Sequence, residues 1–265
     1  MSLRLKPTFA QRLEGSERPL VGMWVCSVSP VMAEIAAGSG LDWVMIDAEH
    51  SPQSLLDMQN QLQAMAAYPV TPVVRMPIGD PTLIKQVLDL GPQNIIVPMV
   101  STAEQAEQIV RAATYPPTGI RGVGSALARS ARWGRVSDYL TNADQYVSVF
   151  VQIETVEGAA NAAEIAAVEG VDGVFVGPSD LAASMGVIGQ QANPIVVESV
   201  RETFEAVRAA GKPVGVNAFD HSVARQYLEW GVNFVLVTSD VTLVARGSEA
   251  AAEAFGLGAT EAESY

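Results

Sequence analysis

The sequence contains two informative stretches, Val151-Gln-Ile-Glu-Thr155 and, further along, Val176-Gly-Pro-Ser-Asp-Leu181. Each reads as an apolar β-strand that ends at a carboxylate, which is Glu154 in the first stretch and Asp180 in the second. The helical pattern between them, about residues 159–167, has the length of one crossover. Because parallel strands joined by a crossover usually lie side by side, about 4.8 Å apart, we expect both carboxylates at one edge of a parallel sheet.

Short apolar runs alternate with Ala-rich, amphipathic helical runs along the rest of the chain. About eight runs resemble strands that are buried on both faces; they are residues 20–24, 43–47, 72–75, 94–97, 147–153, 173–176, 213–216 and 234–238. Eight such units in 265 residues predict a single-domain (β/α)₈ TIM barrel spanning residues 1–265, with a frayed acidic tail from about residue 257. A doubly wound open sheet is the alternative, but no Gly-x-Gly-x-x-Gly follows the first strand. The longest irregular segment is expected at residues 115–135, and a loop of that length is often functional.

The composition limits the possible partners. The formal net charge of −13 disfavours nucleic acid and anionic membranes, and no apolar run is long enough to span a bilayer. Cys26 is the only cysteine and the N-terminus lacks an apolar signal segment, so we expect a cytoplasmic protein. An anionic substrate would be repelled by the overall charge and would need a local positive centre.

Glu154 and Asp180 are the candidate metal ligands. Hard oxygen ligands, with no cysteine or histidine nearby in the sequence, suit Mg²⁺ or Mn²⁺, and two protein carboxylates leave positions open for water and substrate. The alternative is that both are solvated carboxylates at strand ends, with Asp180 capping the following helix.

Active sites of (β/α)₈ barrels lie at the C-terminal ends of the strands. Here those ends carry Trp24, Asp47 to His50, Arg75 to Pro77, Pro98, Gln152, Glu154, Gly177 to Asp180, Asn217 and Thr238. Arg75 could hold an oxyanion or form a salt bridge, and Trp24 could line the site or belong to the core. His50 suits a general acid or base near neutral pH.

Lysine is scarce, and this limits the chemistry. Only Lys6, Lys85 and Lys212 occur, and none is expected at the C-terminal end of a strand. A Schiff-base mechanism therefore has no candidate nucleophile, and carbonyl chemistry would depend on a metal as Lewis acid.

Several motifs resemble those of the metal-dependent (class II) pyruvate aldolases, from about Gly22 to Gly256. They are Asp47-Ala-Glu-His-Ser-Pro52, Val73-Val-Arg75, Val97-Pro-Met-Val100, residues 115–129, Val151-Gln-Ile-Glu-Thr155 and Val174-Phe-Val-Gly-Pro-Ser-Asp-Leu181. The resemblance implies a (β/α)₈ barrel, a homohexamer built as a dimer of trimers with an exchanged C-terminal helix, and Mg²⁺, Mn²⁺ or Co²⁺.

The resemblance also implies roles for individual residues: metal ligation by Glu154 and Asp180, enolate stabilisation by Arg75, base catalysis by His50, and substrate contacts from Gln152, Ser179 and Asp180. It places on Asp89 the acid that raises the basicity of the histidine. Reasoning from the sequence alone favours Asp47 for that role, because Asp89 belongs near the end of a helix, towards the far end of its own barrel.

The predicted function is reversible aldol cleavage of a 4-hydroxy-2-oxoacid to pyruvate, or a close 2-oxoacid analogue, and an aldehyde. One alternative is a related barrel lyase acting on acyl-CoA esters, which would need a basic nucleotide-binding patch; the available cations are Arg121, Arg129, Arg132 and Arg135. Another is a non-catalytic oxoacid-binding protein, which would have no need of His50.

Overall fold

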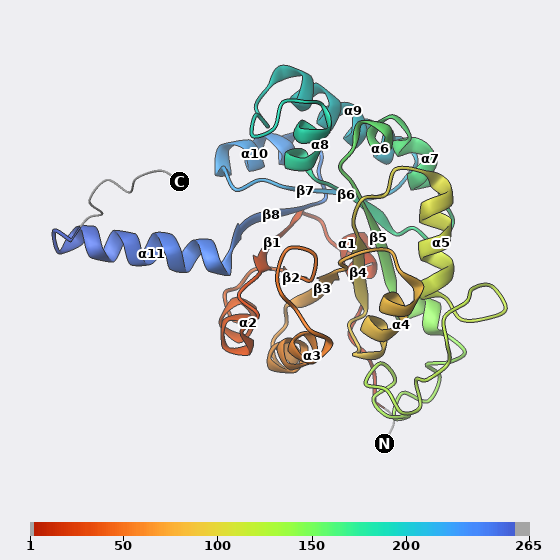
Figure 1. Ribbon diagram of the computed structural model, residues 1–265. Coiled ribbons are helices and arrows are strands. Elements are labelled where there is room, and N and C mark those ends of the chain that lie inside the picture. Colours follow the sequence, from red (N-terminus) through yellow and green to blue (C-terminus); the bar gives the residue numbers. More distant parts are fainter. Residues whose placement is uncertain (1–2, 258–265) are drawn as a thin grey trace.

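The structure is a computed structural model that describes residues 3–257. Within this range a closed barrel of parallel strands runs in sequence order, as predicted (Figure 1). Its strands are β1 (Leu20–Val25), β2 (Trp43–Asp47), β3 (Thr71–Arg75), β4 (Asn94–Val97), β5 (Ser148–Ile153), β6 (Gly173–Val176), β7 (Val214–Asn217) and β8 (Phe234–Ser239). The predicted acidic tail lies outside the described residues, except for Leu257.

Helices alternate with the strands. They are α1 (Phe9–Glu14), α2 (Pro30–Ala37), α3 (Leu55–Ala64), η1 (Met65–Ala67), α4 (Pro81–Asp89), α5 (Ala103–Ala113), η2 (Ala143–Gln145), α6 (Val156–Ala160), α7 (Ala162–Ala167), α8 (Pro178–Ser184), α9 (Pro194–Ala209), α10 (His221–Glu229) and α11 (Asp240–Ala254). The crossover predicted at residues 159–167 is divided at Asn161 into α6 and α7. It joins β5 to β6, which pair with Ile153 opposite Val176.

Aromatic side chains fill the N-terminal end of the barrel. Phe9 of α1 packs against Trp43, Phe150 and Phe234, with ring centroids 4.9–5.4 Å apart. Glycine on a neighbouring strand makes room for such a ring, since a Cβ at Gly215 would lie 2.1 Å from Phe234. Large and small residues therefore alternate around the interior, and the barrel is filled rather than hollow.

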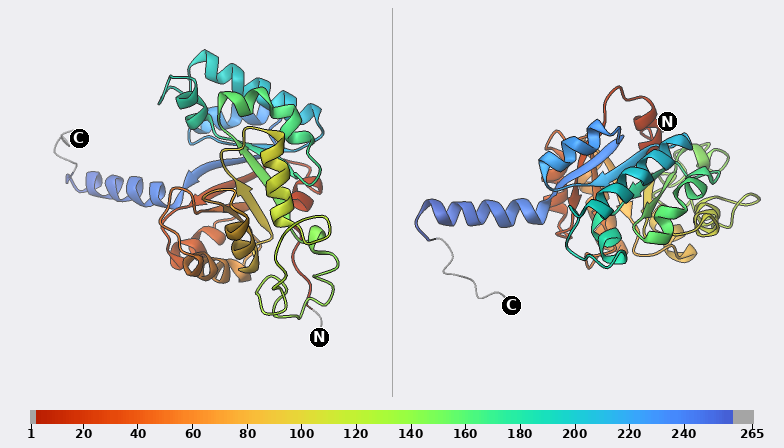
Figure 2. Two further views of the ribbon diagram at one scale, coloured as in Figure 1. Left: turned by 45° about the vertical axis from the view of Figure 1, so that its right-hand side comes forward. Right: turned by 90° about the horizontal axis from the view of Figure 1, so that it is seen from above.

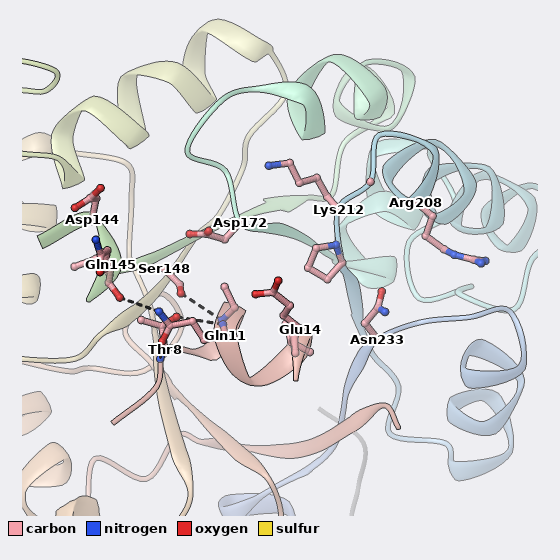
Figure 3. A pocket seen from close by; sticks show the side chains of 15 residues that line it. Thr8, Gln11, Glu14, Asp144, Gln145, Ser148, Asp172, Arg208, Lys212 and Asn233 are labelled. Carbon is pink, nitrogen blue, oxygen red and sulfur yellow. Dashed lines mark hydrogen bonds between the residues drawn. The ribbon is translucent and has the colours of Figure 1, made fainter. Parts of the chain in front are cut away.

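A cavity of about 650 Å³ lies beside α1 at this N-terminal end, and we call it the floor cavity (Figure 3). Asp172 and Lys212 line it together with Glu14 and Arg208. Asp172 accepts a 2.7 Å hydrogen bond from the backbone N–H of Val149. Lys212 donates a 2.6 Å hydrogen bond to the carbonyl of Val171. Both charges are thus tied to the ends of the strands that they adjoin.

A buried arginine helps to hold the irregular segment between α5 and β5 to the barrel. Arg121 pairs with Asp89 of α4 at 3.0 Å and lies over the ring of Tyr115 at 4.6 Å. Apart from the short η2, this segment occupies residues 114–147 and so exceeds the loop predicted at residues 115–135. Its arrangement depends on tertiary contacts such as these.

The C-terminal helix α11 projects away from the barrel (Figures 1 and 2). Only Asp240, its first residue, is buried, whereas Leu243 and Val244 are more than half exposed. Within residues 3–257, no helix has the length and apolar character that crossing a membrane requires.

Candidate active site

The guanidinium of Arg75 is fixed at the C-terminal mouth of the barrel by two carboxylates. Asp47 lies opposite Arg75 in the pairing of β2 with β3. Its Oδ1 accepts a 2.9 Å hydrogen bond from Nε of Arg75 and forms an ion pair with Nη2 at the same distance, and Nη1 forms an ion pair with Glu49 Oε2 at 2.7 Å. Because Arg75 is only 6% exposed, these contacts hold its charge in one orientation.

Trp24 forms the wall beneath this arginine. The guanidinium carbon lies 4.3 Å from the centre of the indole ring, within the range of a cation–π interaction. The indole N–H donates to Asn217 Oδ1 at 2.7 Å, and the ring packs edge-on against Phe175. Trp24 is therefore both a core residue and a wall of the mouth, which were the two readings left open by the sequence.

Glu154 is buried just past the end of β5, with 2% of its surface exposed. Its Oε1 accepts a 2.8 Å hydrogen bond from the backbone N–H of Met99, and its Oε2 accepts one from the side chain of Gln152. Gly177 faces this carboxylate from the end of β6. A Cβ at Gly177 would lie 2.8 Å from Glu154 Oε2, so glycine is required for the carboxylate to keep its position.

The pKa of Glu154 is raised to about 7. Burial is the main cause, the hydrogen bonds from Gln152 and Met99 oppose it, and the nearby charges of Glu49 and Asp180 raise the pKa further. Burial also raises the pKa of Glu49, although Arg75 acts in the opposite direction. The carboxylates of Glu49, Glu154 and Asp180 therefore repel one another. The nearby positive charge of Arg75 is already paired with Asp47 and Glu49.

This excess of negative charge fits a divalent cation. The available donors are carboxylate oxygens, which hard cations prefer. The buried amide oxygen of Gln152 has no hydrogen-bond partner within residues 3–257, so the mouth also contains an unsatisfied acceptor. Across the same residues, no group of three or more His, Cys, Asp and Glu side chains is arranged to hold a metal alone. A cation here would complete its coordination with water and substrate.

Asp180 lies in the first turn of α8, and its side chain is exposed. The N-cap of this helix is Gly177, and no side chain caps it, so the alternative of Asp180 as an N-cap is wrong. Ser179 is also exposed, and its hydroxyl accepts a 2.9 Å hydrogen bond from Gln191. The carboxylate of Asp180 therefore does not cap α8 and can bind a ligand at the mouth of the barrel.

His50 is exposed on the loop after β2, and Asp47 fixes the backbone of that loop. Asp47 Oδ1 accepts hydrogen bonds from the N–H groups of Glu49 at 3.0 Å and His50 at 3.3 Å. Asp47 thus positions both Arg75 and the backbone that carries His50.

Asp89 lies elsewhere. It ends α4, which follows β3 and returns towards the N-terminal end of the barrel, and its carboxylate pairs with Arg121. Of the residues predicted for the site, the structure separates only Asp89 from the mouth. Asp89 could therefore act on His50 only if it came from a second copy of the chain.

The sequence placed Glu49 and Asn217 at strand ends without giving either of them a role. In the structure Glu49 completes the cage around Arg75, and Asn217 orients Trp24. One residue of the mouth was not predicted at all. Met99 has a positive φ of 59°, which is uncommon for a residue other than glycine and often marks a functional site. The motif Asp47-Ala-Glu-His50 contained a signal for Glu49, because its acid shares the strand end with Arg75, but no sequence pattern reveals the backbone of Met99.

The chain is similar to known aldolases over most of its length. It is 51% identical over 251 residues to the hydroxypyruvate/pyruvate aldolase of Deinococcus radiodurans, covering 95% of this chain and 90% of that protein. It is 49% identical over 243 residues to a 4-hydroxy-2-oxo-heptane-1,7-dioate aldolase of Escherichia coli, covering 92% and 93%.

A solved structure extends the likeness to three dimensions. The crystal structure of an HpcH/HpaI aldolase/citrate lyase family protein from Burkholderia cenocepacia superimposes on this chain with a TM-score of 0.90. The two are 39% identical, and the match covers 93% of this chain and 98% of that one. Together these relatives confirm the predictions of an enzyme and of an aldolase. Residues 20–247 match the HpcH/HpaI aldolase/citrate lyase family, and the chain belongs to that family.

Proposed function

We propose that this protein catalyses the reversible aldol cleavage of a 4-hydroxy-2-oxoacid to pyruvate, or a close 2-oxoacid analogue, and an aldehyde, with the mouth of the barrel as its active site. One observation carries the proposal. A buried carboxylate, Glu154, is surrounded by further negative charge and lies on the same face as an arginine held rigidly by two acids. Hydroxypyruvate/pyruvate and 4-hydroxy-2-oxo-heptane-1,7-dioate aldolases are the activities named for the relatives at about half identity.

Glu154 and Asp180 would hold a divalent metal ion, Mg²⁺, Mn²⁺ or Co²⁺. Such an ion supplies a Lewis acid for the 2-oxo group and the local positive charge that the acidic chain lacks. Gln152 contributes by orienting Glu154, and its free amide oxygen is available to a hydrogen-bond donor of a ligand. Ser179 and Gly177 line the same strand end and are proposed to contact substrate.

Arg75 and His50 have separable roles in this proposal. Arg75 is held by Asp47, Glu49 and Trp24, so its guanidinium can stabilise the negative charge that develops on the enolate oxygen without reorganising. His50 is exposed and can remove the proton of the C4 hydroxyl, directly or through a water, as the C3–C4 bond breaks. The same residue returns the proton in the direction of synthesis.

We also propose that α11 packs on a second copy of the chain within a homohexamer, a dimer of trimers. The helix projects from its own barrel with Leu243, Val244 and Val241 exposed, and burial of such side chains against another subunit would be favourable. Leu243→Asp combined with Val244→Asp should therefore lower the mass measured by light scattering. An unchanged mass would contradict the exchange.

Product analysis tests the proposed reaction. Pyruvate is incubated with a panel of aldehydes, with and without added Mg²⁺, Mn²⁺ or Co²⁺, and the adducts are identified by mass spectrometry. We expect 4-hydroxy-2-oxoacids only in the presence of metal, and no loss of activity after borohydride treatment with pyruvate, because Lys85 and Lys212 lie away from the mouth. Trapping of pyruvate on either lysine would contradict the metal-dependent reaction.

A binding protein without catalytic activity would give a different result. It would bind pyruvate in the presence of metal but would not exchange the methyl protons of pyruvate in deuterated water. Exchange that is fast in the wild type and depends on added metal supports enolate formation. Binding without any exchange would remove the enzymatic proposal.

A further inference from the structure

A second pocket, of about 240 Å³, lies on the N-terminal face of the barrel, away from the candidate active site. We call it the basic pocket and define it by its four cationic side chains, Arg4, Lys6, Arg129 and Arg132. The N-terminal arm, the end of α3 and the starts of β3 and β4 line it, and the long loop after α5 supplies the two later arginines. Segments distant in the sequence thus bring positive charge to one place.

These cations form no ion pair with a carboxylate of residues 3–257, although Asp138 lines a neighbouring pocket together with Arg4. No aspartate or glutamate lines the pocket, and none of the four cations forms an ion pair with a described residue. This is unexpected in a chain with a net charge of −13, in which an acid is nearly twice as frequent as a lysine or arginine. If the charged residues were distributed at random, a pocket lined by four cations would be expected to contain at least one carboxylate as well.

The hydrogen bonds that these side chains make go to backbone carbonyls. Arg129 donates to Leu90 at 3.0 Å and to Leu62 at 3.2 Å, near the C-terminal ends of α4 and α3. Capping of helix ends therefore explains part of the role of Arg129. It does not explain Arg132, whose guanidinium donates to the carbonyl of Arg129 itself, nor the presence of Arg4.

Gly91 shows that the backbone makes room for Arg132. A Cβ at this position would lie 2.7 Å from Nη1 of Arg132, and the φ of +85° favours glycine as well. Arg129 and Arg132 are both half-buried, and burial together with the charge of Arg132 lowers the pKa of Arg129 to about 10. Two guanidiniums held together in this way repel each other, and a bound anion would relieve the repulsion.

We propose that the basic pocket binds a small dianion, held by charge-assisted hydrogen bonds from Arg129 and Arg132 with Lys6 and Arg4 at the rim. The volume is below that of sites for drug-sized ligands and suits a compact anion. Inorganic phosphate and a short dicarboxylate share the required chemistry, which is two negative charges spread over several oxygens. The site lies at the opposite end of the barrel from Glu154, so it is independent of the proposed reaction.

Isothermal titration of the full chain tests the site, with inorganic phosphate in one arm and succinate in the other, at constant ionic strength set with chloride. The wild type is compared with Arg132→Gln, Arg129→Gln and Arg4→Gln. The control is Arg225→Gln, which removes the same charge from an exposed position on α10. Circular dichroism verifies that each variant folds. If replacement of Arg129 or Arg132 prevents folding, Arg4→Gln still tests the pocket, because Arg4 lies on the exposed N-terminal arm.

We expect Arg132→Gln and Arg129→Gln to lose one binding event per chain or to weaken it about tenfold or more, and Arg4→Gln to weaken it less. Arg225→Gln should retain the wild-type isotherm. Loss confined to the phosphate arm identifies a phosphate site, and loss confined to the succinate arm identifies a dicarboxylate site. Two results would overturn the proposal. One is that the pocket variants give the wild-type isotherm with both phosphate and succinate, and the other is that the wild type binds neither anion.

Discussion

Two carboxylates at opposite ends of the barrel, Glu154 at the mouth and Asp172 at the floor, share several properties. Each accepts a hydrogen bond from a backbone N–H, at 2.8 Å and 2.7 Å respectively. Burial raises the pKa of both. They differ in their neighbours, because Lys212 balances the charge of Asp172, whereas Glu49 and Asp180 add to the charge of Glu154.

This difference shows that a raised pKa does not by itself identify a functional acid. At the floor, the charge of Lys212 lowers the pKa of Asp172 and so opposes the effect of burial, and both side chains line the same cavity (Figure 3). At the mouth, the negative charge exceeds the positive charge, and the one arginine is already engaged. The mouth therefore offers a cation from outside the chain a favourable place, whereas the floor has a cation of its own in Lys212.

The largest expected effects concern the mouth and separate His50 from Arg75. Loss of a general base costs about 10²–10⁴-fold in rate, so His50→Ala should lower kcat for cleavage of a 4-hydroxy-2-oxoacid by that factor. Decarboxylation of oxaloacetate needs only the enolate and should suffer less. Arg75→Lys should lower kcat for both reactions by about 10²–10³-fold.

Both reactions are measured at saturating Mn²⁺, with Asp144→Asn as the control. Asp144 is an exposed acid of the floor cavity and should have no effect on either reaction. If His50→Ala reduced both reactions equally, the role of His50 as base for the hydroxyl would have to be abandoned.

A smaller effect is expected from the glycine that faces Glu154. In Gly177→Ala the new methyl group would lie 2.8 Å from Glu154 Oε2 and would displace the carboxylate. A shift of about 1 Å in a catalytic group can cost about 10²-fold, so kcat should fall by roughly that factor, with weaker binding of Mn²⁺.

The control for this variant is Gly15→Ala, which follows α1 at the opposite end of the barrel and where a Cβ would meet, among residues 3–257, only the carbonyl of Gln11, at 3.4 Å. That variant should keep the wild-type kcat. Full activity and Mn²⁺ affinity in Gly177→Ala would show that the position of Glu154 is not critical, and the contrast between mouth and floor would lose its basis.

The smallest expected effect is on stability, at the floor. Because the pKa of Asp172 is raised in the folded protein, the native state binds this proton more tightly than the unfolded chain. The stabilisation is complete below the unfolded pKa of about 3.9 and is lost as the pH rises through the folded pKa. Asp172→Asn removes this dependence, so its stability relative to the wild type should increase with pH.

Urea denaturation at pH 4, 6 and 8 measures this change, which should be of the order of 1 kcal/mol. Asp144→Asn again serves as the matched control, and its free energy of unfolding should track that of the wild type. A difference between Asp172→Asn and the wild type that is constant with pH would mean that Asp172 has the same affinity for protons in both states.

Much of the fold could be predicted because the strands are buried on both faces and punctuated regularly. The bounds of β2, β4 and β6 agree with the predicted ranges residue for residue. Each is a continuous apolar run, which leaves little freedom in placing it. The long loop of residues 114–147 was underestimated, since Arg121 and its partners lie far apart in the sequence.

The positions of side chains at the mouth were predictable where a residue lies at the end of its own strand. Arg75 and Glu154 follow that rule, as does Asp47. Glu49 and Asn217 were also placed at strand ends, but their contacts were not predicted, because their partners Arg75 and Trp24 lie on other strands. Asp89 could partner His50 only if two copies of the chain packed together, as proposed above, and sequence periodicity does not encode such packing.

Titration of Mn²⁺ into the wild type, Glu154→Gln and Asp172→Asn tests the contrast between mouth and floor most directly. Both substitutions replace a carboxylate of raised pKa, buried in Glu154 and half-buried in Asp172, by its neutral isostere. We predict one Mn²⁺ per chain for the wild type and for Asp172→Asn, and no binding to Glu154→Gln. Unchanged Mn²⁺ affinity in Glu154→Gln would contradict the assignment of the metal site to the mouth of the barrel.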